Sequence, residues 1–328
     1  MATSDKNTAL HGVIFGIMAF AVFSSHDAVV KLVGRDFSAI QVIFFSVLFG
    51  FPTVAMSMSA DRALDNFRPH HPWFLALRTV MMVISMMCIF YAFSTLPLTQ
   101  VYAIIFMSPL VTTVLSVPLL GEVVRLRRWI AIFFGLAGVL VVLRPGLTPM
   151  TAGHLAALVA AVLNACGGIV IRKISADERS AVLILFPMFA NLAVAAIVLP
   201  FVYKPMAIGE LGLTAMIGVL AFAGQALLIA AFKRASPTLI APMQYSQIIW
   251  ATLFGVLFFN ETPDLWVGIG TAIIVSSGIY IVWRESRDTV SDNRPVLNTP
   301  NMRQDTGPST DPKGKGRVSM GIRIRYSD

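Results

Sequence analysis

The second half of this chain repeats the first half. The apolar run Val114–Glu122, which ends in a glutamate, matches Leu253–Glu261 at an offset of 139 residues, and Ala92–Phe93 matches Ala231–Phe232 at the same offset. Each half holds five apolar stretches, and an odd number of crossings brings the second half into a membrane from the opposite side. Inverted repeats of this kind are typical of secondary transporters, which bind their solute between the halves near the middle of the bilayer.

The composition favours a membrane protein. Hydrophobic residues make up 56% of the chain and charged residues only 13%, whereas a soluble domain carries about 25% charged residues. A helix needs roughly 20 apolar residues to cross about 30 Å of hydrocarbon, and in lipid its backbone must satisfy its own hydrogen bonds. The sequence therefore predicts an all-α integral membrane protein with ten transmembrane helices, over residues 10–33, 37–58, 73–95, 98–120, 129–144, 151–172, 181–203, 209–231, 238–259 and 264–284.

These spans divide the chain into four parts. Residues 1–9 are expected to form a short cytoplasmic N-terminus, 10–144 the first five-helix repeat and 151–284 the second, inverted five-helix repeat. Residues 285–328 are rich in polar residues, proline and glycine. Because this segment holds too few apolar side chains to fold alone, we expect a disordered cytoplasmic tail.

The Lys and Arg residues of the chain are concentrated in the loops on one side of the predicted spans. With ten spans both termini lie on one side, and the loops on that side hold thirteen Lys and Arg residues, against four near the opposite side, Lys31, Arg35, Arg144 and Lys204. Because Lys and Arg accumulate in cytoplasmic loops, we expect both termini in the cytoplasm. The net charge of +8 is thus explained by orientation in a membrane, and no nucleic-acid partner is expected.

Ionisable residues inside a span cost a few kcal/mol and are functional candidates by default. Asp27 and Lys31 lie four residues apart on one helical face, where an acid preceding a base favours an ion pair. Asp27 is a candidate proton site or a ligand for a cationic group, while Lys31 can also extend to the interface and neutralise Asp27. His26 is either a titratable group or an interfacial residue. Arg78 can extend to the interface or bind a carboxylate or phosphate.

The spans 98–120 and 238–259 occupy matching positions in the two repeats and contain the deepest prolines, Pro109 and Pro242. Helix-interior proline frees a backbone carbonyl and kinks a helix, so we expect these two spans to face each other across a solute cavity. Their amide and aromatic side chains suit a flat or amphipathic solute, although interhelical hydrogen bonds and interfacial aromatics explain the same pattern. The candidate substrate-binding residues are Asp27, Arg78, Gln100, Tyr102, Phe106, Asn164, Gln225, Gln244, Tyr245 and Trp250.

Two glutamates end these spans, Glu122 and Glu261. A carboxylate in this position can accept N–H bonds from the first turn of the next helix, where the helix dipole favours an anion. We therefore expect both glutamates to act as helix caps. The chain has no nucleotide-binding loop, metal-binding helix or nucleophile elbow, so the sequence indicates neither a cofactor nor a metal and favours a non-enzyme.

The segment from Ala92 to Arg144 and its echo from Ala231 to Arg284 resemble the EamA-like branch of the drug/metabolite transporter superfamily. The residues that carry this resemblance are Pro97, Pro109, Gly121, Glu122, Trp129, Gly135 and Gly138, together with Asp27 and Lys31 in the first span. The resemblance covers residues 10–284, and the second repeat departs from it at Asn260, which stands where the first repeat has glycine.

Members of this superfamily move amino acids, nucleotide sugars, vitamins such as riboflavin, S-adenosylmethionine and drugs. The resemblance implies a bacterial inner-membrane carrier of a small organic molecule that works by alternating access, with a coupling proton as a candidate partner. Riboflavin-like uptake and amino-acid export are the two specific candidates. A passive channel or a non-transporting membrane protein is the alternative, and the oligomeric state stays open.

The charge asymmetry generates a topology prediction. Reporter fusions after residue 285 and within residues 204–209 should report opposite sides of the membrane, with the 285 fusion cytoplasmic, because an odd number of crossings separates the two sites. Alkaline phosphatase and green fluorescent protein fusions measure this directly. The same sidedness at both sites would contradict the ten-span arrangement.

Overall fold

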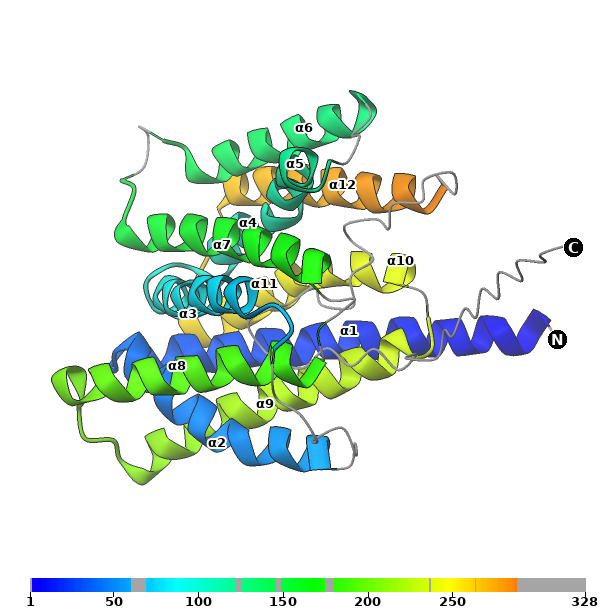
Figure 1. Ribbon diagram of the computed structural model, residues 1–328. Coiled ribbons are helices and arrows are strands. Elements are labelled where there is room, and N and C mark those ends of the chain that lie inside the picture. The colour runs from blue at the N-terminus through cyan, green and yellow to red at the C-terminus, as the bar shows by residue number, and fades with distance from the viewer. Residues whose placement is uncertain are drawn as a thin grey trace, which may run out of the picture.

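The computed structural model describes residues 2–59, 69–121, 126–145, 149–174, 178, 180–235, 237–262 and 264–287, and it confirms the predicted all-α fold (Figure 1). Glu122 and the predicted tail from residue 288 onward lie outside these ranges. The unbroken helices are α1 (Ala2–Val33), α2 (Ala39–Ser59), α3 (Pro72–Thr95), α6 (Leu126–Leu143), α7 (Ala152–Ile174), α8 (Ser180–Val202), α9 (Ile208–Phe232) and α12 (Leu265–Arg287).

Two of the predicted spans are broken helices. The span 98–120 consists of α4 (Leu98–Ile105) and α5 (Ser108–Leu120), and the span 238–259 consists of α10 (Pro237–Ile240), the 3-10 helix η1 (Ala241–Ser246) and α11 (Gln247–Phe259). Pro109 and Pro242 each lie in the first turn of the segment after a break, where proline's missing N–H leaves no hydrogen bond unmade. The predicted kinks are therefore interruptions in which each proline starts a new helical segment.

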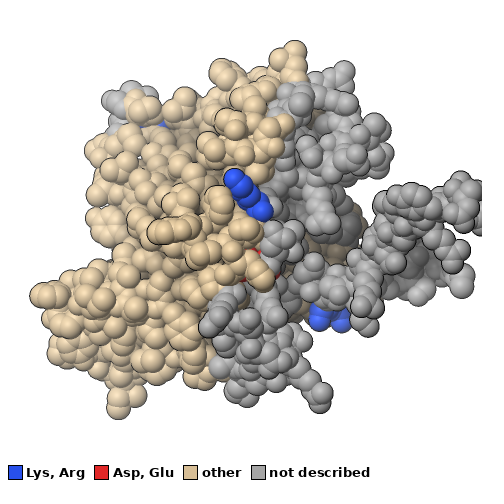
Figure 2. Space-filling model, in the orientation of Figure 1, with Lys and Arg blue, Asp and Glu red and all other residues tan. Residues whose placement is uncertain are grey.

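The described part of the chain has helices suited to a membrane. Six of them are long and apolar enough to cross one, and three further apolar helices are shorter. Large apolar side chains also lie on the outside, among them Trp73, Phe201 and Ile208, each more than four-fifths exposed. On the face drawn in Figure 2, most of the described residues are uncharged, with isolated Lys or Arg side chains and little Asp or Glu. Such a surface is compatible with lipid contact and unfavourable in water.

The two repeats run in opposite directions. Leu75, near the start of α3, clusters with Ile174 at the end of α7, so these helices are antiparallel. The start of α7 packs against the end of α3, because a Cβ on Gly153 would lie 2.4 Å from Thr95 Oγ1. Since Lys31, near the end of α1, also reaches the end of α3, the second repeat begins at the end of the bundle where α1 finishes. This is the predicted inversion.

The first helix of each repeat packs along the third helix of the other repeat, α1 along α9 and α7 along α3. The equivalent helices α6 and α12 lie side by side at one edge (Figure 1). The broken helices occupy the middle, where α4 contacts α11 and also α7. The main apolar core surrounds this region and contains Tyr102, Phe106 and Phe93. The interruptions in the two broken helices are therefore held inside protein, as non-helical backbone at membrane depth must be.

Candidate functional site

Asp27 is a fully buried acid in α1. Its Oδ2 accepts a hydrogen bond from the hydroxyl of Tyr102 in α4, and its Oδ1 lies 2.7 Å from His26 Nδ1. The Tyr102 hydroxyl is also 3.4 Å from Ser24 Oγ. Ser24, His26 and Tyr102 are each at most 3% exposed. These groups form a polar cluster enclosed by apolar core, where an acid depends on its hydrogen-bond partners because water does not reach it.

The predicted Asp27–Lys31 ion pair is wrong. Lys31 Nζ lies 2.8 Å from Oε1 of Glu261 and donates to the carbonyl of Leu96. Lys31 is also only 6% exposed, so its side chain does not extend to the interface. Glu261 reaches Lys31 from the second repeat, while the carboxylate of Asp27 is held by Tyr102 and His26.

Glu261 caps a helix, although not the one predicted. Its Oε2 accepts the backbone N–H of Leu98 at 3.0 Å, and Leu98 is the first residue of α4 in the other repeat. The next helix, α12, is capped instead by Asp264, whose Oδ1 accepts the N–H of Trp266 at 3.2 Å. Asn260, with φ of 52°, ends α11 in the left-handed conformation and turns the chain, so that Glu261 faces the first repeat.

A row of aromatic rings extends from the Asp27 cluster into the second repeat. The centroids of Phe93 and Tyr102 are 5.7 Å apart, those of Tyr102 and Phe106 5.9 Å, and those of Phe106 and Tyr245 5.1 Å. These spacings fall in the range of favourable ring contacts. Tyr245 in turn points at Gly278 of α12, where a Cβ would lie 1.6 Å from its hydroxyl. Only glycine leaves room for the tyrosine there.

The structure thus brings four of the ten candidate residues together, Asp27, Tyr102, Phe106 and Tyr245. Phe106 lies at the interruption between α4 and α5, and Tyr245 lies in η1. The expectation that the two matching spans face each other is supported by the contact of their rings. Interrupted helices near the middle of a membrane bundle expose backbone groups and helix ends that can bind a solute.

Three other candidates lie in helix–helix interfaces. Arg78 is buried and its Nη1 donates to the carbonyl of Leu183 at 2.6 Å, which joins α3 to α8. Asn164 accepts a hydrogen bond from the Ser85 hydroxyl at 2.9 Å, between α7 and α3. Gln225 is buried in α9 beside Gly224, which packs on Phe23 of α1. Arg78 therefore neither extends to the interface nor reaches the Asp27 cluster in this conformation.

The last three candidates do not join the cluster. Gln100 is half-buried in the first turn of α4 and Gln244 is half-buried in η1. Among the described residues, neither amide side chain hydrogen-bonds to Asp27 or to its partners. Trp250 stacks on Phe254 along α11, with centroids 6.4 Å apart.

His26 and Glu178 carry roles that the sequence did not assign. His26 was a candidate interfacial residue, yet it is buried against Asp27 and packs edge-on against Phe90. The position of His26 next to Asp27 inside a span was the sequence signal that could have predicted its burial. Glu178 lies between α7 and α8, and its Oε1 accepts the N–H of His71, just before α3, at 2.5 Å. Glu178 directly follows Asp177 in a short charged loop, so residue type alone did not single it out.

Several polar contacts join the repeats where α1 ends, which we call the Lys31 end of the bundle. Besides the Lys31–Glu261 pair, Arg144 binds Asp264, and the side chain of Gln41 exchanges two hydrogen bonds, of 2.6 and 2.9 Å, with the backbone of Lys204. Phe259 lies under both Lys31 and Arg35, whose cationic groups are 5.4 and 4.8 Å from its ring centroid. These contacts hold the two repeats together at this end.

Comparison with known proteins gives one family and several relatives. The sequence model of the EamA-like transporter family matches residues 10–144 and 151–283. A pseudopaline exporter from Pseudomonas aeruginosa is 29% identical over 83% of this chain and 93% of its own length. An S-adenosylmethionine uptake transporter from Rickettsia prowazekii is 24% identical over 87% of this chain and 96% of its length.

A human protein, solute carrier family 35 member G1, is 25% identical over 82% of this chain and 78% of its own length. One solved crystal structure superposes with a TM-score of 0.55 at 18% identity and covers 83% of this chain. That likeness supports the fold alone.

The Lys31–Glu261 pair generates a stability prediction. Replacing Lys31 by Met leaves Glu261 without its cation, and breaking a buried pair costs about 3–5 kcal/mol. Glu261→Gln keeps an acceptor for Leu98 but leaves Lys31 unpaired. The double variant should therefore be less destabilised than the sum of the two single variants, which thermal unfolding in detergent measures as a coupling free energy.

Lys204→Met is the matched control for this cycle. Lys204 is exposed, and among the described residues its Nζ donates to the carbonyl of Asp36, at 3.1 Å, so its loss should change the melting temperature little. Additive effects of Lys31→Met and Glu261→Gln would show that the two side chains do not interact.

Proposed function

Because the chain belongs to the EamA-like transporter family, we propose that it is a secondary transporter that moves a small organic metabolite by alternating access. The single observation that carries this proposal is the Asp27 cluster. A fully buried carboxylate of the first repeat accepts a hydrogen bond from Tyr102 in one broken span, and a row of aromatic rings leads from Tyr102 to Tyr245 in the broken span of the second repeat.

The chemistry of this cluster favours a solute with a cationic group and a flat or apolar body. Asp27 offers a carboxylate whose present partners, the Tyr102 hydroxyl and the His26 ring, can be displaced by an ammonium or sulfonium group. Tyr102, Phe106 and Tyr245 offer ring faces for stacking. A proton and a solute cation would compete for the same carboxylate, which supplies a way to couple their movements.

The names of the relatives narrow the candidate solutes. Riboflavin-like uptake and amino-acid export both agree with an aromatic, amide-rich bundle, but the relatives include an S-adenosylmethionine uptake transporter and a pseudopaline exporter. S-adenosylmethionine combines an ammonium group, a sulfonium cation and an adenine ring, and so matches both parts of the site. We therefore propose S-adenosylmethionine as the first solute to test, followed by amino acids and riboflavin.

We place the protein in a bacterial inner membrane with both termini in the cytoplasm. The bacterial sources of two relatives and the loop charges support this orientation. The Lys31 end then faces the periplasm. Two ion pairs between the repeats lie at this end. They support a conformation that is closed toward the periplasm, from which transport requires the Lys31–Glu261 pair to separate.

The transport test uses purified protein in liposomes. A thermal-shift screen against metabolites first identifies a ligand, because a solute that binds the folded state raises the melting temperature. Labelled solute should then enter faster when the liposomes are preloaded with unlabelled solute. A passive channel would show no such acceleration, and that result would exclude alternating access.

Replacing Asp27 by Asn should leave folding largely intact while lowering solute exchange and removing its dependence on pH between about 5 and 8, because the amide keeps the shape but neither ionises nor pairs with a cation. Asp36→Asn is the matched control, since Asp36 is exposed just beyond the end of α1. Exchange rates in liposomes across this pH range measure the effect. An unchanged rate and pH profile in Asp27→Asn would remove Asp27 from the mechanism.

Tyr102→Leu and Tyr245→Leu test the aromatic part of the site. Each change keeps apolar bulk but removes the ring and hydroxyl, and losing a ring that stacks on the solute should cost about 1 kcal/mol. We expect a severalfold weaker affinity for the ligand found in the screen, measured by calorimetry. Tyr91→Leu, an exposed tyrosine of α3, is the control. If both site variants bind as the parent does, the solute binds elsewhere.

A further inference from the structure

Gln247 is a buried amide that the site described so far does not use. It is the first residue of α11, directly after η1, and it is 3% exposed. Among the described residues, its Nε2 has no hydrogen-bond partner. A buried donor without an acceptor is unfavourable, because it has lost water and gained nothing in return. An unpaired group of this kind is therefore a candidate for binding something that is not part of the protein.

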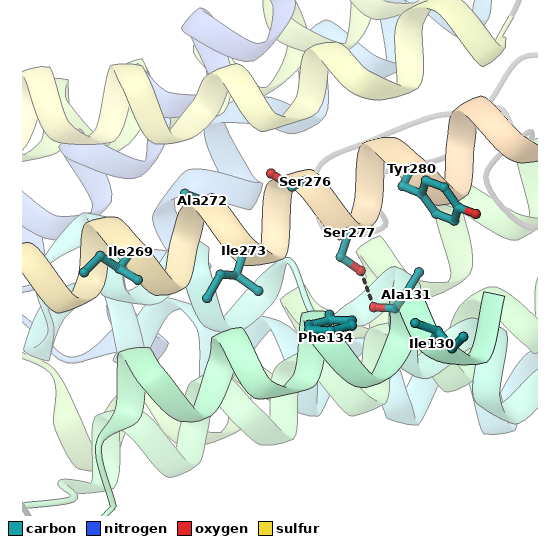
Figure 3. A pocket seen from close by; sticks show the side chains of 9 residues that line it. All are labelled: Ile130, Ala131, Phe134, Ile269, Ala272, Ile273, Ser276, Ser277 and Tyr280. Atoms are coloured by element: carbon teal, nitrogen blue, oxygen red, sulfur yellow. Dashed lines mark hydrogen bonds between the residues drawn. The ribbon is translucent and has the colours of Figure 1, made fainter. Parts of the chain in front are cut away.

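Two other buried polar side chains show the more usual arrangement. Gln41, which is 0% exposed, uses its amide for two hydrogen bonds with the backbone of Lys204. Ser277 borders the apolar groove between α6 and α12, and its hydroxyl donates to the carbonyl of Ala131 (Figure 3). In both places the polar group joins two segments of the chain. Within the part of the chain that the structure describes, the Nε2 of Gln247 makes no such bond.

The buried face of α11 is turned toward the first repeat. Gln247, Ala251 and Gly255 are buried and lie four residues apart, which places them on one side of the helix. At Gly255 a Cβ would lie 2.8 Å from Oε2 of Glu261. The same oxygen accepts the N–H of Leu98 at the start of α4. Gln247 therefore lies on the side of α11 that meets α4, and these two helices are in contact.

The depth of Gln247 in the bundle follows from the helical rise of about 1.5 Å per residue. α4 begins and α11 ends near Glu261, which contacts both Leu98 and the position of a Cβ on Gly255. Phe106 is eight residues after Leu98, which places it about 12 Å deeper. Gln247 is eight residues before Gly255, so it lies at about the same depth as Phe106.

Two tyrosines connect this position to the Asp27 cluster. Tyr245, two residues before Gln247, contacts Phe106 with ring centroids 5.1 Å apart. Tyr102, whose hydroxyl binds Asp27, lies one turn of α4 before Phe106, or about 6 Å. Gln247 therefore lies about one helical turn deeper than Tyr102. The region between the repeats thus offers a carboxylate at one level and an unpaired donor one turn further in.

We propose that the Gln247 amide donates a hydrogen bond to a carboxylate of the solute whose cationic group binds Asp27. This role rests on the proposed transport function and narrows the solute to a zwitterion, such as an amino acid or an amino-acid derivative. A hydrogen bond to a carboxylate is stronger than one to a neutral carbonyl, because one partner is charged. Solute binding would also give Gln247 the acceptor that the protein does not supply. S-adenosylmethionine, the first solute to test, carries both a cation and a carboxylate.

The melting temperature without solute tests whether the amide is unpaired. Gln247→Met keeps a long, unbranched side chain and removes the donor, so it should raise the melting temperature in detergent by a few degrees. Gln41→Met is the matched control, because it removes an amide that is fully paired, and it should lower the melting temperature. A fall or no change in Gln247→Met would show that the amide is paired inside the protein, and would overturn the proposal.

Affinities for S-adenosylmethionine and for its decarboxylated form, measured by calorimetry, test the carboxylate. The parent and Gln41→Met should bind the carboxylate-bearing compound at least about tenfold more tightly, as expected for a hydrogen bond to a charged group. In Gln247→Met the two affinities should become nearly equal. A ratio measured on one variant is insensitive to shifts between its conformations. Equal affinity or no binding of both compounds in the parent overturns the proposal, and so does an unchanged preference in Gln247→Met.

The transport function is judged separately, by solute exchange in liposomes. A protein that exchanges solute while Gln247→Met keeps the preference of the parent refutes the role of Gln247 alone. A protein that exchanges no solute refutes transport, whatever the melting temperatures of the variants are.

Discussion

A charged group inside a membrane bundle must be paired, because its transfer from water costs several kcal/mol and contact with lipid does not offset this cost. Lys31 meets this constraint through Glu261, which lies on the other repeat and at the same time caps the first residue of α4. One carboxylate thus fixes the end of α1, the start of α4 and the turn after α11. The positions of Tyr102 and of the interruption before α5 follow from where α4 begins.

Asp27 depends on the same arrangement. With Lys31 turned toward Glu261, the acid one turn earlier is held by Tyr102 and His26. The aromatic row then connects this acid to Tyr245 in η1, which fits because residue 278 of α12 is glycine. The acid, the aromatic rings and the two interrupted helices therefore form one unit between the repeats. Movement of the repeats relative to each other would change all of its contacts together, which is what alternating access around a central site requires.

The sequence predicted the helical fold and its inversion because the repeat, the hydropathy and the number of spans are properties of the chain alone. The spans with Pro109 and Pro242 also pointed to the centre of the bundle. The partner of Lys31 was not predictable in the same way. The i,i+4 spacing favoured Asp27, whereas Glu261 is 230 residues from Lys31 in the sequence and meets it only in the folded bundle. Arg78, Asn164 and Gln225 could not be separated from Asp27 by residue type, since a polar side chain in a span serves helix packing as well as solute binding.

The central claim is that the Lys31–Glu261 pair closes one side of a solute site at Asp27. Ser24, which is 1% exposed and lies beside the Tyr102 hydroxyl, reports on it directly. In a chain with Cys88 and Cys166 replaced by alanine, Ser24→Cys can be labelled in intact cells with a maleimide that does not cross the inner membrane. The account predicts slow labelling while the pair is intact and markedly faster labelling when Glu261→Gln is added. An equal rate in the two backgrounds would contradict it.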